Sequence, residues 1–378
     1  MNKLRITTIV GTRPEIIRLS ATIAILEQHF EHRLIHTGQN SANFMKDVFF
    51  KELRIRTPDL EIQLENHSLA TNLASIFIGV EKELLDNRPD AVVILGDTNS
   101  ALSVIIAKRM GIPVYHLEAG NRSFDPNVPE EINRRIVDHS SDFNLVYSEH
   151  ARRNLLDEGI HPRTICLIGS PMYEVIANNL VSINNSDILE RLKISDQEYF
   201  VVSTHRQENI DSPERLTSVV SVLNEVADTF GLPIILSTHP RTKEKLEKIQ
   251  LKTHDKIQVL EPLGFIDYCQ LQSKALLTIS DSGSVSEESV ILGFKAITLR
   301  DSMERPEALE AGCILMNGIN SVSLINGINF KLNTELSKNP PAEYLVQDSS
   351  ARTVNFILST IQNFHFWSGL RKQSSFFL

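Results

Sequence analysis

The chain has 378 residues, of which 42% are hydrophobic and 22% charged, and its formal net charge is −9 at pH 7. One hydrophobic core usually stops growing at about 250–300 residues, so two domains are expected. The acidic balance argues against a nucleic-acid-binding surface, and no apolar run approaches the roughly 18 residues that cross a bilayer.

The cysteines and the first residues predict where the protein works. Cys166, Cys269 and Cys313 are isolated, odd in number and without CxxC spacing. This pattern favours neither a disulfide framework nor a zinc site, so no metal is expected and a reducing, cytoplasmic location is the simplest inference. The opening MNKLRITTIVGTRPE is typical of a first β-strand rather than a signal peptide.

Strand–helix alternation begins at once. An apolar strand ends at Gly11, and a helical pattern follows in which Thr12 and Glu15 have capping-box spacing and Pro14 lies in the first turn. A second unit of the same kind lies near residues 32–38. These units predict parallel strands joined by crossover helices.

The third unit is the clearest. A strand at 91–95 leads into Gly96 and Asp97, and a helix is predicted from about 99 to 110. A second strand at 114–117 ends directly at Glu118.

Near residue 170 the chain becomes richer in Ser and Asn, which indicates an interdomain connection, and strand–helix alternation then restarts. Helical spacing returns from about 350 to 366. The predicted fold class is α/β, with two Rossmann-like domains of parallel sheets facing a central cleft. The predicted parts are a first domain at 1–170, a second at 171–350 and a terminal helix at 351–378.

Ionisable and polar residues follow many of the predicted strands, where ligands bind in open α/β sheets. Each has an ordinary alternative: Asp97 as a helix cap, Glu118 as a partner of Arg122, and His205 as a loop histidine. Together they favour an active cleft. The strand-end set is Arg13, Asp97, Glu118, His205, His239, Asp281, Ser282, Arg300 and Asp301.

The stretch HLEAGNRSFDPNVPEEINRR at 116–135 concentrates charge. Glu130 with Arg134, and Glu131 with Arg135, have the spacing of helical ion pairs. This spacing leaves Glu118 unexplained.

A different signal lies in ISDSGSVSEES, where a strand leads through Ser282, Gly283 and Ser284 into a helix that bears Glu287 and Glu288. A helix N-terminus with two hydroxyls and a glycine suits a phosphate, although the same residues form ordinary helix caps. Either glutamate is a candidate for ribose hydroxyls. The expected cationic complement is Arg13, Arg18 and Arg305.

Seven motifs lie along the chain in this order: GTRPEIIR at 11–18, GDT at 96–98, HLEAGNR at 116–122, PEEINRR at 129–135, THRQEN at 204–209, DSGSVSEE at 281–288 and RDSMERPEA at 300–308. Together they resemble the non-hydrolysing UDP-N-acetylglucosamine 2-epimerases. The resemblance implies the two-domain glycosyltransferase-B fold, in which the terminal helix at 351–378 packs back on the first domain. It also implies inversion at C2 of a UDP-linked N-acetylhexosamine, with no metal or nicotinamide cofactor.

The resemblance also implies roles for individual residues. The family eliminates UDP across C1–C2 and adds it back with the proton on the opposite face, so it needs two proton-transfer stations. By motif position the catalytic residues are Asp97, Glu118, Glu130 and His205. The residues that hold the UDP-sugar are Arg13, Arg18, Tyr268, Ser282, Gly283, Ser284, Glu288 and Arg305.

The sequence departs from the commonest family pattern at several positions. Arg18 replaces a lysine, Asn121 replaces a leucine, and Ser284 replaces the second glycine of a pair. The segment after HTGQ also differs from the stretch that binds a second, activating UDP-sugar in some members. HLEAGNRSFD and STHPRT resemble the branch that makes UDP-N-acetylfucosamine for capsule and O-antigen, which leaves the sugar open.

Two other functions fit part of the pattern. A glycosyltransferase of the same fold would bind a UDP-sugar but would need an acceptor and would not need three carboxylates. A sugar-nucleotide sensor would not need the intact proton-transfer positions. The expected partners are a UDP-sugar and a second copy of the chain, with no nucleic acid and no membrane.

Overall fold

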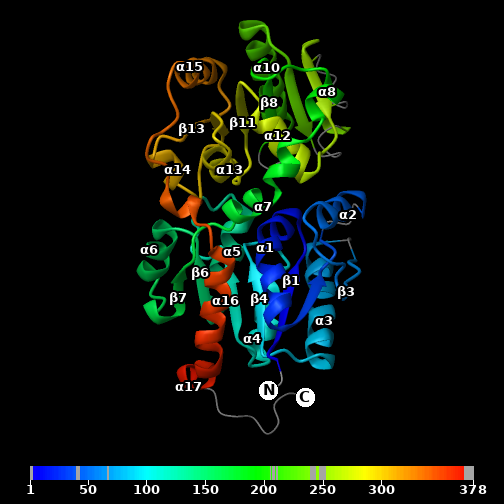
Figure 1. The fold of residues 1–378 in the computed structure, drawn as a ribbon, viewed down its shortest axis with the longest axis vertical. Helices are drawn as coiled ribbons and strands as arrows, with labels where there is room; N and C mark the ends of the chain where they lie inside the picture. Colours follow the sequence, from blue (N-terminus) through cyan, green and yellow to red (C-terminus); the bar gives the residue numbers. More distant parts are fainter. Residues whose placement is uncertain are drawn as a thin grey trace. The chain divides into compact units, whose positions relative to one another are not determined.

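The computed structural model describes residues 3–39, 43–65, 68–204, 206, 209, 212–238, 244–246 and 253–369. The chain forms two compact units. Unit 1 comprises Met1–Val175 with Leu345–Leu378, and unit 2 comprises Ile176–Tyr344. Each unit has a parallel sheet with helices (Figure 1), so the predicted α/β class with two parallel-sheet domains is confirmed.

Unit 1 is built on a seven-stranded sheet with the order β3-β2-β1-β4-β5-β6-β7. Every neighbouring pair is parallel. The strands predicted at 91–95 and 114–117 are present with those bounds. The strands are β1 (Arg5–Val10), β2 (Glu31–His36), β3 (Leu60–Glu61), β4 (Ala91–Leu95), β5 (Val114–Leu117), β6 (Phe143–Val146) and β7 (Ile165–Leu167).

The helices of unit 1 alternate with these strands. The helix predicted from 99 begins instead as a 3₁₀ turn at Ala101, and the Ser100 hydroxyl that precedes it contacts Gln39 and Thr37. The helices are α1 (Arg13–His29), α2 (Asn43–Glu52), α3 (Leu69–Asp86), η1 (Ala101–Ser103), α4 (Val104–Arg109), α5 (Pro129–Ser140), α6 (Glu149–Asp157), η2 (Pro162–Thr164), α16 (Ser349–Thr360), η4 (Ile361–Asn363) and α17 (Phe364–Ser368).

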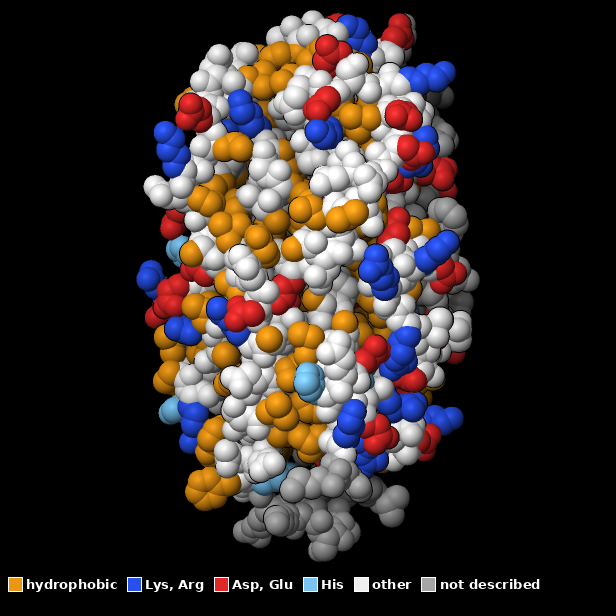
Figure 2. All heavy atoms as spheres, in the orientation of Figure 1, with side chains coloured by type: hydrophobic (Ala, Val, Ile, Leu, Met, Phe, Trp, Pro, Cys, Tyr) orange, Lys and Arg blue, Asp and Glu red, His pale blue; other side chains and the backbone are white. Residues whose placement is uncertain are grey.

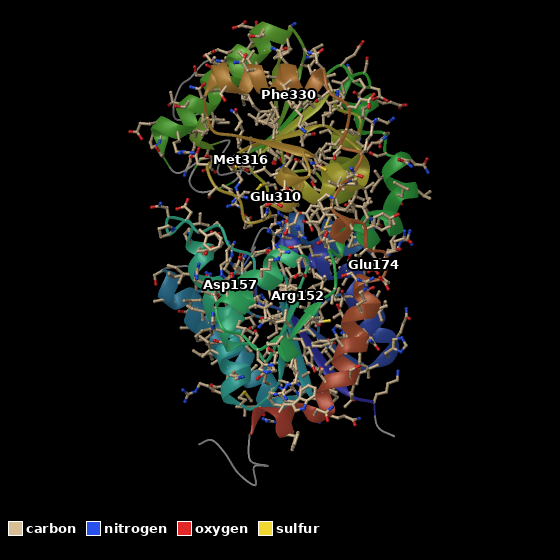
Figure 3. All side chains as sticks on the ribbon, turned by 90° about the vertical axis from the view of Figure 1, so that its left-hand side faces the viewer. Arg152, Asp157, Glu174, Glu310, Met316 and Phe330 are labelled. Atoms are coloured by element: carbon tan, nitrogen blue, oxygen red, sulfur yellow. The ribbon has the colours of Figure 1, made fainter. Side chains whose placement is uncertain are left out.

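The C-terminal helix α16 belongs to unit 1 and lies beside α1 (Figure 1). Its first turn is fixed by two hydrogen bonds. The Ser350 amide donates to the Glu174 carboxylate at 3.1 Å, and the Ser349 hydroxyl donates to the Gly169 carbonyl at 3.0 Å. Figure 3 labels Glu174 at this end of α16.

Unit 2 is built on a six-stranded parallel sheet with the order β10-β9-β8-β11-β12-β13. Its strands are β8 (Phe200–Thr204), β9 (Ile234–Thr238), β10 (Ile257–Leu260), β11 (Leu277–Ser280), β12 (Ala296–Leu299) and β13 (Ile314–Asn317). The helices of the second half of the chain are α7 (Met172–Asn184), α8 (Ile188–Leu192), α10 (Pro213–Phe230), α12 (Phe265–Ser273), α13 (Val285–Leu292), α14 (Glu307–Glu310), α15 (Ser321–Leu332) and η3 (Ala342–Leu345).

Several strands that have a neighbour on each side are buried along their whole length, and these strands are apolar runs rather than alternating ones. Every residue of β4 (AVVIL) and β12 (AITL) is buried. Helices on both faces of a parallel sheet produce this pattern. Figure 2 shows acidic and basic side chains mixed among the described residues of the face in view. In the described part of the chain no helix is both long enough and apolar enough to traverse a bilayer.

Candidate active site

The strand order of unit 1 reverses between β1 and β4, which is the place where open α/β sheets bind ligands. The loops after β1, β4 and β5 all begin at the carboxyl ends of these strands. They carry Arg13, Asp97 and Glu118. The structure therefore brings three of the predicted residues to one edge of unit 1.

The loop after β1 packs closely against the side chains of Thr37 and Ser100. A Cβ atom on Gly11 would lie 2.0 Å from the Ser100 hydroxyl and 2.2 Å from the Thr37 hydroxyl, so only glycine fits. Arg13 opens α1 and is half-buried, with its guanidinium carbon 5.9 Å from the centroid of the Phe49 ring. Burial lowers the pKa of Arg13 from its ordinary value.

Glu15 joins this loop to the loop after β4. Its buried carboxylate accepts the Gly11 amide at 2.7 Å, the Thr12 amide at 2.6 Å and the Thr98 hydroxyl at 2.6 Å. Burial raises the pKa of Glu15 to about 7, although these three hydrogen bonds lower it. The predicted capping interaction of Glu15 with Thr12 is thus present, and Glu15 also supports the segment next to Asp97.

Two side chains of α5 donate hydrogen bonds to Asp97. Arg134 donates to Asp97 Oδ2 from Nε at 3.1 Å and from Nη2 at 2.5 Å, and Asn133 donates to the Asp97 carbonyl at 2.9 Å. The Asp97 side chain keeps 23% of its surface exposed. The carboxylate is therefore oriented by a cation and still accessible.

Glu118 has an unusual backbone. Its φ of 67° lies in the left-handed region, which costs a non-glycine residue roughly 1–2 kcal/mol. Its Oε2 lies 3.2 Å from Arg18 Nε, and its side chain is 12% exposed. The alternative that Glu118 pairs with Arg122 is wrong, because Arg122 pairs with Asp138 and Glu158.

The charged stretch that follows divides into an exposed and a buried part. Glu130 lies in the first turn of α5 and is exposed. The predicted pair of Glu131 and Arg135 is present at 3.0 Å. Glu131 and Arg134 are both buried, so they are structural residues rather than members of a solvated helix face.

The sheet of unit 2 reverses between β8 and β11. His205 and His239, which follow β8 and β9, lie outside the described residues. Asp281 follows β11, is fully buried, and accepts the Arg206 amide at 3.1 Å and the Asn209 side-chain amide at 3.0 Å. Asp281 therefore fixes the backbone after β8 rather than pointing to solvent.

The predicted phosphate cradle lies at the start of α13. The Ser282 and Ser284 hydroxyls are 3.0 Å apart, and Ser284 is the residue that precedes the helix. A Cβ atom on Gly283 would lie 2.9 Å from Glu304 Oε1 and 3.2 Å from Arg305 Nη1. The glycine lets the backbone lie directly against this charged pair, at a helix terminus that favours anions.

The two glutamates of α13 have different surroundings. Glu287 is fully buried and lies 3.2 Å from Arg305 Nη1. Glu288 accepts the Gln272 side-chain amide at 3.0 Å. Tyr268 is half-buried, and burial together with the charge of Glu288 raises the pKa of its hydroxyl above the usual range.

Sequence reasoning missed several residues that support these sites. His116 lies in the buried strand VYHL, and Glu15, Arg134 and Asp138 are buried inside helices, so an ionisable side chain in such a segment is the signal that could have identified them. Arg206 and Glu304 lie in loops, where the sequence offers no such contrast. The missed residues are Glu15 as a link between loops, His116, Arg134, Asp138, Arg206 and Glu304.

Comparison with known proteins places the chain in a family. A structure of UDP-N-acetylglucosamine 2-epimerase from Rickettsia bellii matches with a TM-score of 0.91 and 37% identity, covering 98% of this chain and 100% of that one. A structure of Methanocaldococcus jannaschii UDP-GlcNAc 2-epimerase in complex with UDP-GlcNAc and UDP has a TM-score of 0.89 and 36% identity, covering 94% and 100%.

Sequence similarity extends to enzymes with a different named substrate. The UDP-2,3-diacetamido-2,3-dideoxy-D-glucuronate 2-epimerase of Pseudomonas aeruginosa is 32% identical over 319 residues, which are 83% of this chain and 88% of that protein. The family model described as UDP-N-acetylglucosamine 2-epimerase matches residues 24–358. The chain therefore belongs to the UDP-N-acetylglucosamine 2-epimerase family.

Proposed function

We propose that this protein is a UDP-N-acetylhexosamine 2-epimerase, an isomerase that inverts C2 by eliminating UDP and adding it back. The observation that carries the proposal is the pair of carboxylates at neighbouring strand ends of unit 1. Asp97 follows β4 and is oriented by Arg134, and Glu118 follows β5 and contacts Arg18. Family membership supports the same reaction.

The chemistry explains why carboxylates are needed. The proton on C2 is not acidic enough for simple exchange, so one group removes it while the C1–O bond breaks and UDP leaves. The resulting 2-acetamidoglucal is then protonated at C2 on the opposite face as UDP returns to C1. Proton transfer on two faces requires two stations. We assign the acid–base roles to the carboxylates Asp97, Glu118 and Glu130, with His205 as a further catalytic candidate.

The leaving group must be held while the C1–O bond is broken. We assign the diphosphate to the start of α13, where Ser282, Gly283 and Ser284 precede the helix and Arg305 supplies charge. This makes the first domain the catalytic one and the second the UDP-binding one. The further residues proposed for the UDP-sugar are Arg13, Arg18, Tyr268 for the uracil and Glu288 for the ribose.

The sugar itself is proposed from the relatives and the motifs. The Methanocaldococcus structure holds UDP-GlcNAc and UDP, and the Pseudomonas relative is named for a diacetamido uronate. We propose that this chain converts UDP-N-acetylglucosamine to UDP-N-acetylmannosamine or acts on a 6-deoxy analogue, for capsule or O-antigen synthesis. The 6-deoxy alternative is favoured by HLEAGNRSFD at 116–125.

Product analysis tests this proposal. The protein is incubated with UDP-N-acetylglucosamine and with the 6-deoxy UDP-N-acetylhexosamines, without an acceptor sugar, and products are followed by proton NMR. Formation of the C2 epimer supports the proposal, and the substrate with the highest kcat/KM identifies the sugar. Turnover that strictly requires an acceptor would reject it in favour of a glycosyltransferase.

We also propose a cytoplasmic homodimer. All three cysteines are free thiols, as expected in a reducing compartment. Ile78 and Leu85 are two helical turns apart on the same face of α3 and are 68% and 65% exposed, which makes this face the candidate interface. Light scattering that gives the mass of one chain would reject the dimer.

A further inference from the structure

His116 lies in β5, two residues before Glu118, and is fully buried. Both of its ring nitrogens have close neighbours. Nε2 lies 2.8 Å from the carbonyl oxygen of Gly96, and Nδ1 lies 2.9 Å from Asp138 Oδ1. Since a carbonyl oxygen only accepts hydrogen bonds, Nε2 carries a proton and donates it to Gly96.

Asp138, from the last turns of α5, extends this connection to the loop after β5. It is 1% exposed, and both of its carboxylate oxygens lie 3.2 Å from the Gly120 amide, which donates to them. Arg122 donates to Asp138 Oδ2 at 2.6 Å. A buried carboxylate with this many donors is fixed in place.

The two ends of this connection lie next to the two carboxylates of the strand ends. Gly96 has a φ of 72° and directly precedes Asp97. Gly120 has a φ of 81° and lies two residues after Glu118, whose own φ is 67°. A Cβ atom on Gly120 would lie 2.3 Å from the Ala151 carbonyl oxygen, so the loop is pressed against α6.

We propose that His116 and Asp138 are positioning residues, a buried pair that holds the loop of Asp97 and the loop of Glu118 in a fixed relation. The pair contacts the backbone on both sides, and both side chains are buried. It acts through Gly96 on one carboxylate and through Gly120 on the other. This inference rests on the proposed catalytic roles of Asp97 and Glu118.

Two substitutions that each replace one ring nitrogen by an amide nitrogen separate the two contacts of His116. In His116→Asn the amide nitrogen takes the place of Nδ1, so the contact with Asp138 is kept and the one with Gly96 is lost. In His116→Gln the amide nitrogen reaches the place of Nε2, so the Gly96 contact is kept. His116→Ala removes both.

A misplacement of about 1 Å can lower a rate about 10²-fold. We therefore expect kcat to fall about 10²-fold in His116→Ala and less in the Asn and Gln variants, while UDP affinity by calorimetry changes by less than about twofold. This split between kcat and binding is not expected of a residue that only stabilises the fold.

His32 provides the matched control. Its side chain is 1% exposed, and it lies near the start of β2, where its Nε2 is 2.8 Å from the Thr8 hydroxyl. His32→Asn should melt at a lower temperature and keep the wild-type kcat in its folded fraction. A wild-type kcat in the folded fraction of His116→Ala would overturn the proposal. If that variant fails to fold, a wild-type kcat in both His116→Asn and His116→Gln would overturn it.

Glu118→Gln is measured beside these variants to separate this proposal from the proposed function. A slow Glu118→Gln with a normal His116 series rejects the positioning role alone. An active Glu118→Gln removes the catalytic role of Glu118 and overturns both.

Discussion

The strand ends of the two units are built from the same kinds of residue but in opposite ways. In unit 1 the carboxylates stay accessible, with Asp97 23% and Glu118 12% exposed, and their arginine partners are buried. In unit 2, Asp281 after β11 and Glu287 in α13 are fully buried, whereas Asp301 after β12 is 61% exposed and pairs with Arg215. Accessible carboxylates suit proton transfer, whereas buried ones serve to fix cations and backbone in place.

The backbone shows the same contrast. Glu118 in unit 1 holds a strained, left-handed conformation directly after a strand. In unit 2 the segment that follows β11 enters α13 with ordinary backbone angles, since Ser284 has φ −73° and ψ −20°. Gly283 in this segment lies close to Glu304 and Arg305. Strain at a functional position persists only when its surroundings enforce it. The carboxylates of unit 1 are therefore expected to control the rate of the chemical step, and the start of α13 in unit 2 is expected to affect UDP binding rather than that rate.

The largest expected effect is that of Glu118→Gln. This nearly isosteric change removes a proton-transfer group, and general acid–base catalysis contributes about 10²–10⁴-fold, so kcat should fall on that scale. UDP affinity should be retained, because the diphosphate is assigned elsewhere. Turnover and thermal melting are measured on one preparation. A variant that melts at a lower temperature but keeps its activity would show that Glu118 is a structural ion pair.

Arg13→Ala should weaken UDP binding. A hydrogen bond to a charged group contributes about 1.5–3 kcal/mol, which corresponds to roughly a 10- to 150-fold higher Kd. Isothermal calorimetry with UDP alone measures it. Arg153→Ala is the control, since its side chain lies on α6 with 68% of its surface exposed. An unchanged Kd for Arg13→Ala would reject its assignment to the diphosphate.

Gly283→Ala tests the UDP-binding side of the comparison. The added methyl group would meet Glu304 and Arg305, and we expect it to displace one of them and raise the Kd for UDP about tenfold. The kcat at saturating substrate should be unchanged. Gly327→Ala in α15 is the control, because its Cβ would meet only the side chains of Leu315 and Ile297. A lower kcat with normal UDP affinity would reverse the roles of the units.

A further effect concerns stability and pH in unit 1 and leaves the rate and UDP binding unchanged. The pKa of Glu15 is raised to about 7 from an ordinary value of 4.5, so the folded state holds the extra proton between these values. The stabilisation that the Glu15 proton gives to the folded state is fully present below pH 4.5 and is lost as the pH rises to about 7. Over this range the free energy of unfolding falls by at most about 1.4 kcal/mol per pH unit.

Glu15→Gln should remove this dependence. The amide oxygen of the substituted side chain can still accept the backbone amides of Gly11 and Thr12, and its amide nitrogen can donate to the Thr98 hydroxyl. Chemical denaturation at about pH 5 and about pH 8 measures the difference between wild type and variant. If wild type and Glu15→Gln differ in free energy of unfolding by the same amount at both pH values, the raised pKa of Glu15 is contradicted.

Much of the fold was predictable because local patterns specify it. The strands at 91–95 and 114–117 and the helix after Ser284 follow from apolar runs bounded by glycine and polar residues. Parallel topology then brings the strand ends together. This is why Arg13, Asp97 and Glu118 could be grouped before any coordinates were known.

The partners of these residues were not predictable, because they depend on tertiary contacts between distant segments. Arg134 has helical spacing to Glu130, yet it contacts Asp97, 37 residues away. Arg18 contacts Glu118, and no local spacing in the sequence indicated this contact. Several charged side chains face each loop, and the chain sequence does not determine which of them pair.

The central claim, that the carboxylates of unit 1 carry protons to and from C2, is tested most directly by hydrogen exchange at that carbon. Wild type, Gly283→Ala and Glu118→Gln are incubated in deuterated water with saturating UDP-N-acetylglucosamine, and deuterium at C2 is followed by proton NMR. We predict exchange in wild type and Gly283→Ala and exchange about 10²–10⁴-fold slower in Glu118→Gln. Exchange in Glu118→Gln at the wild-type rate would contradict the claim.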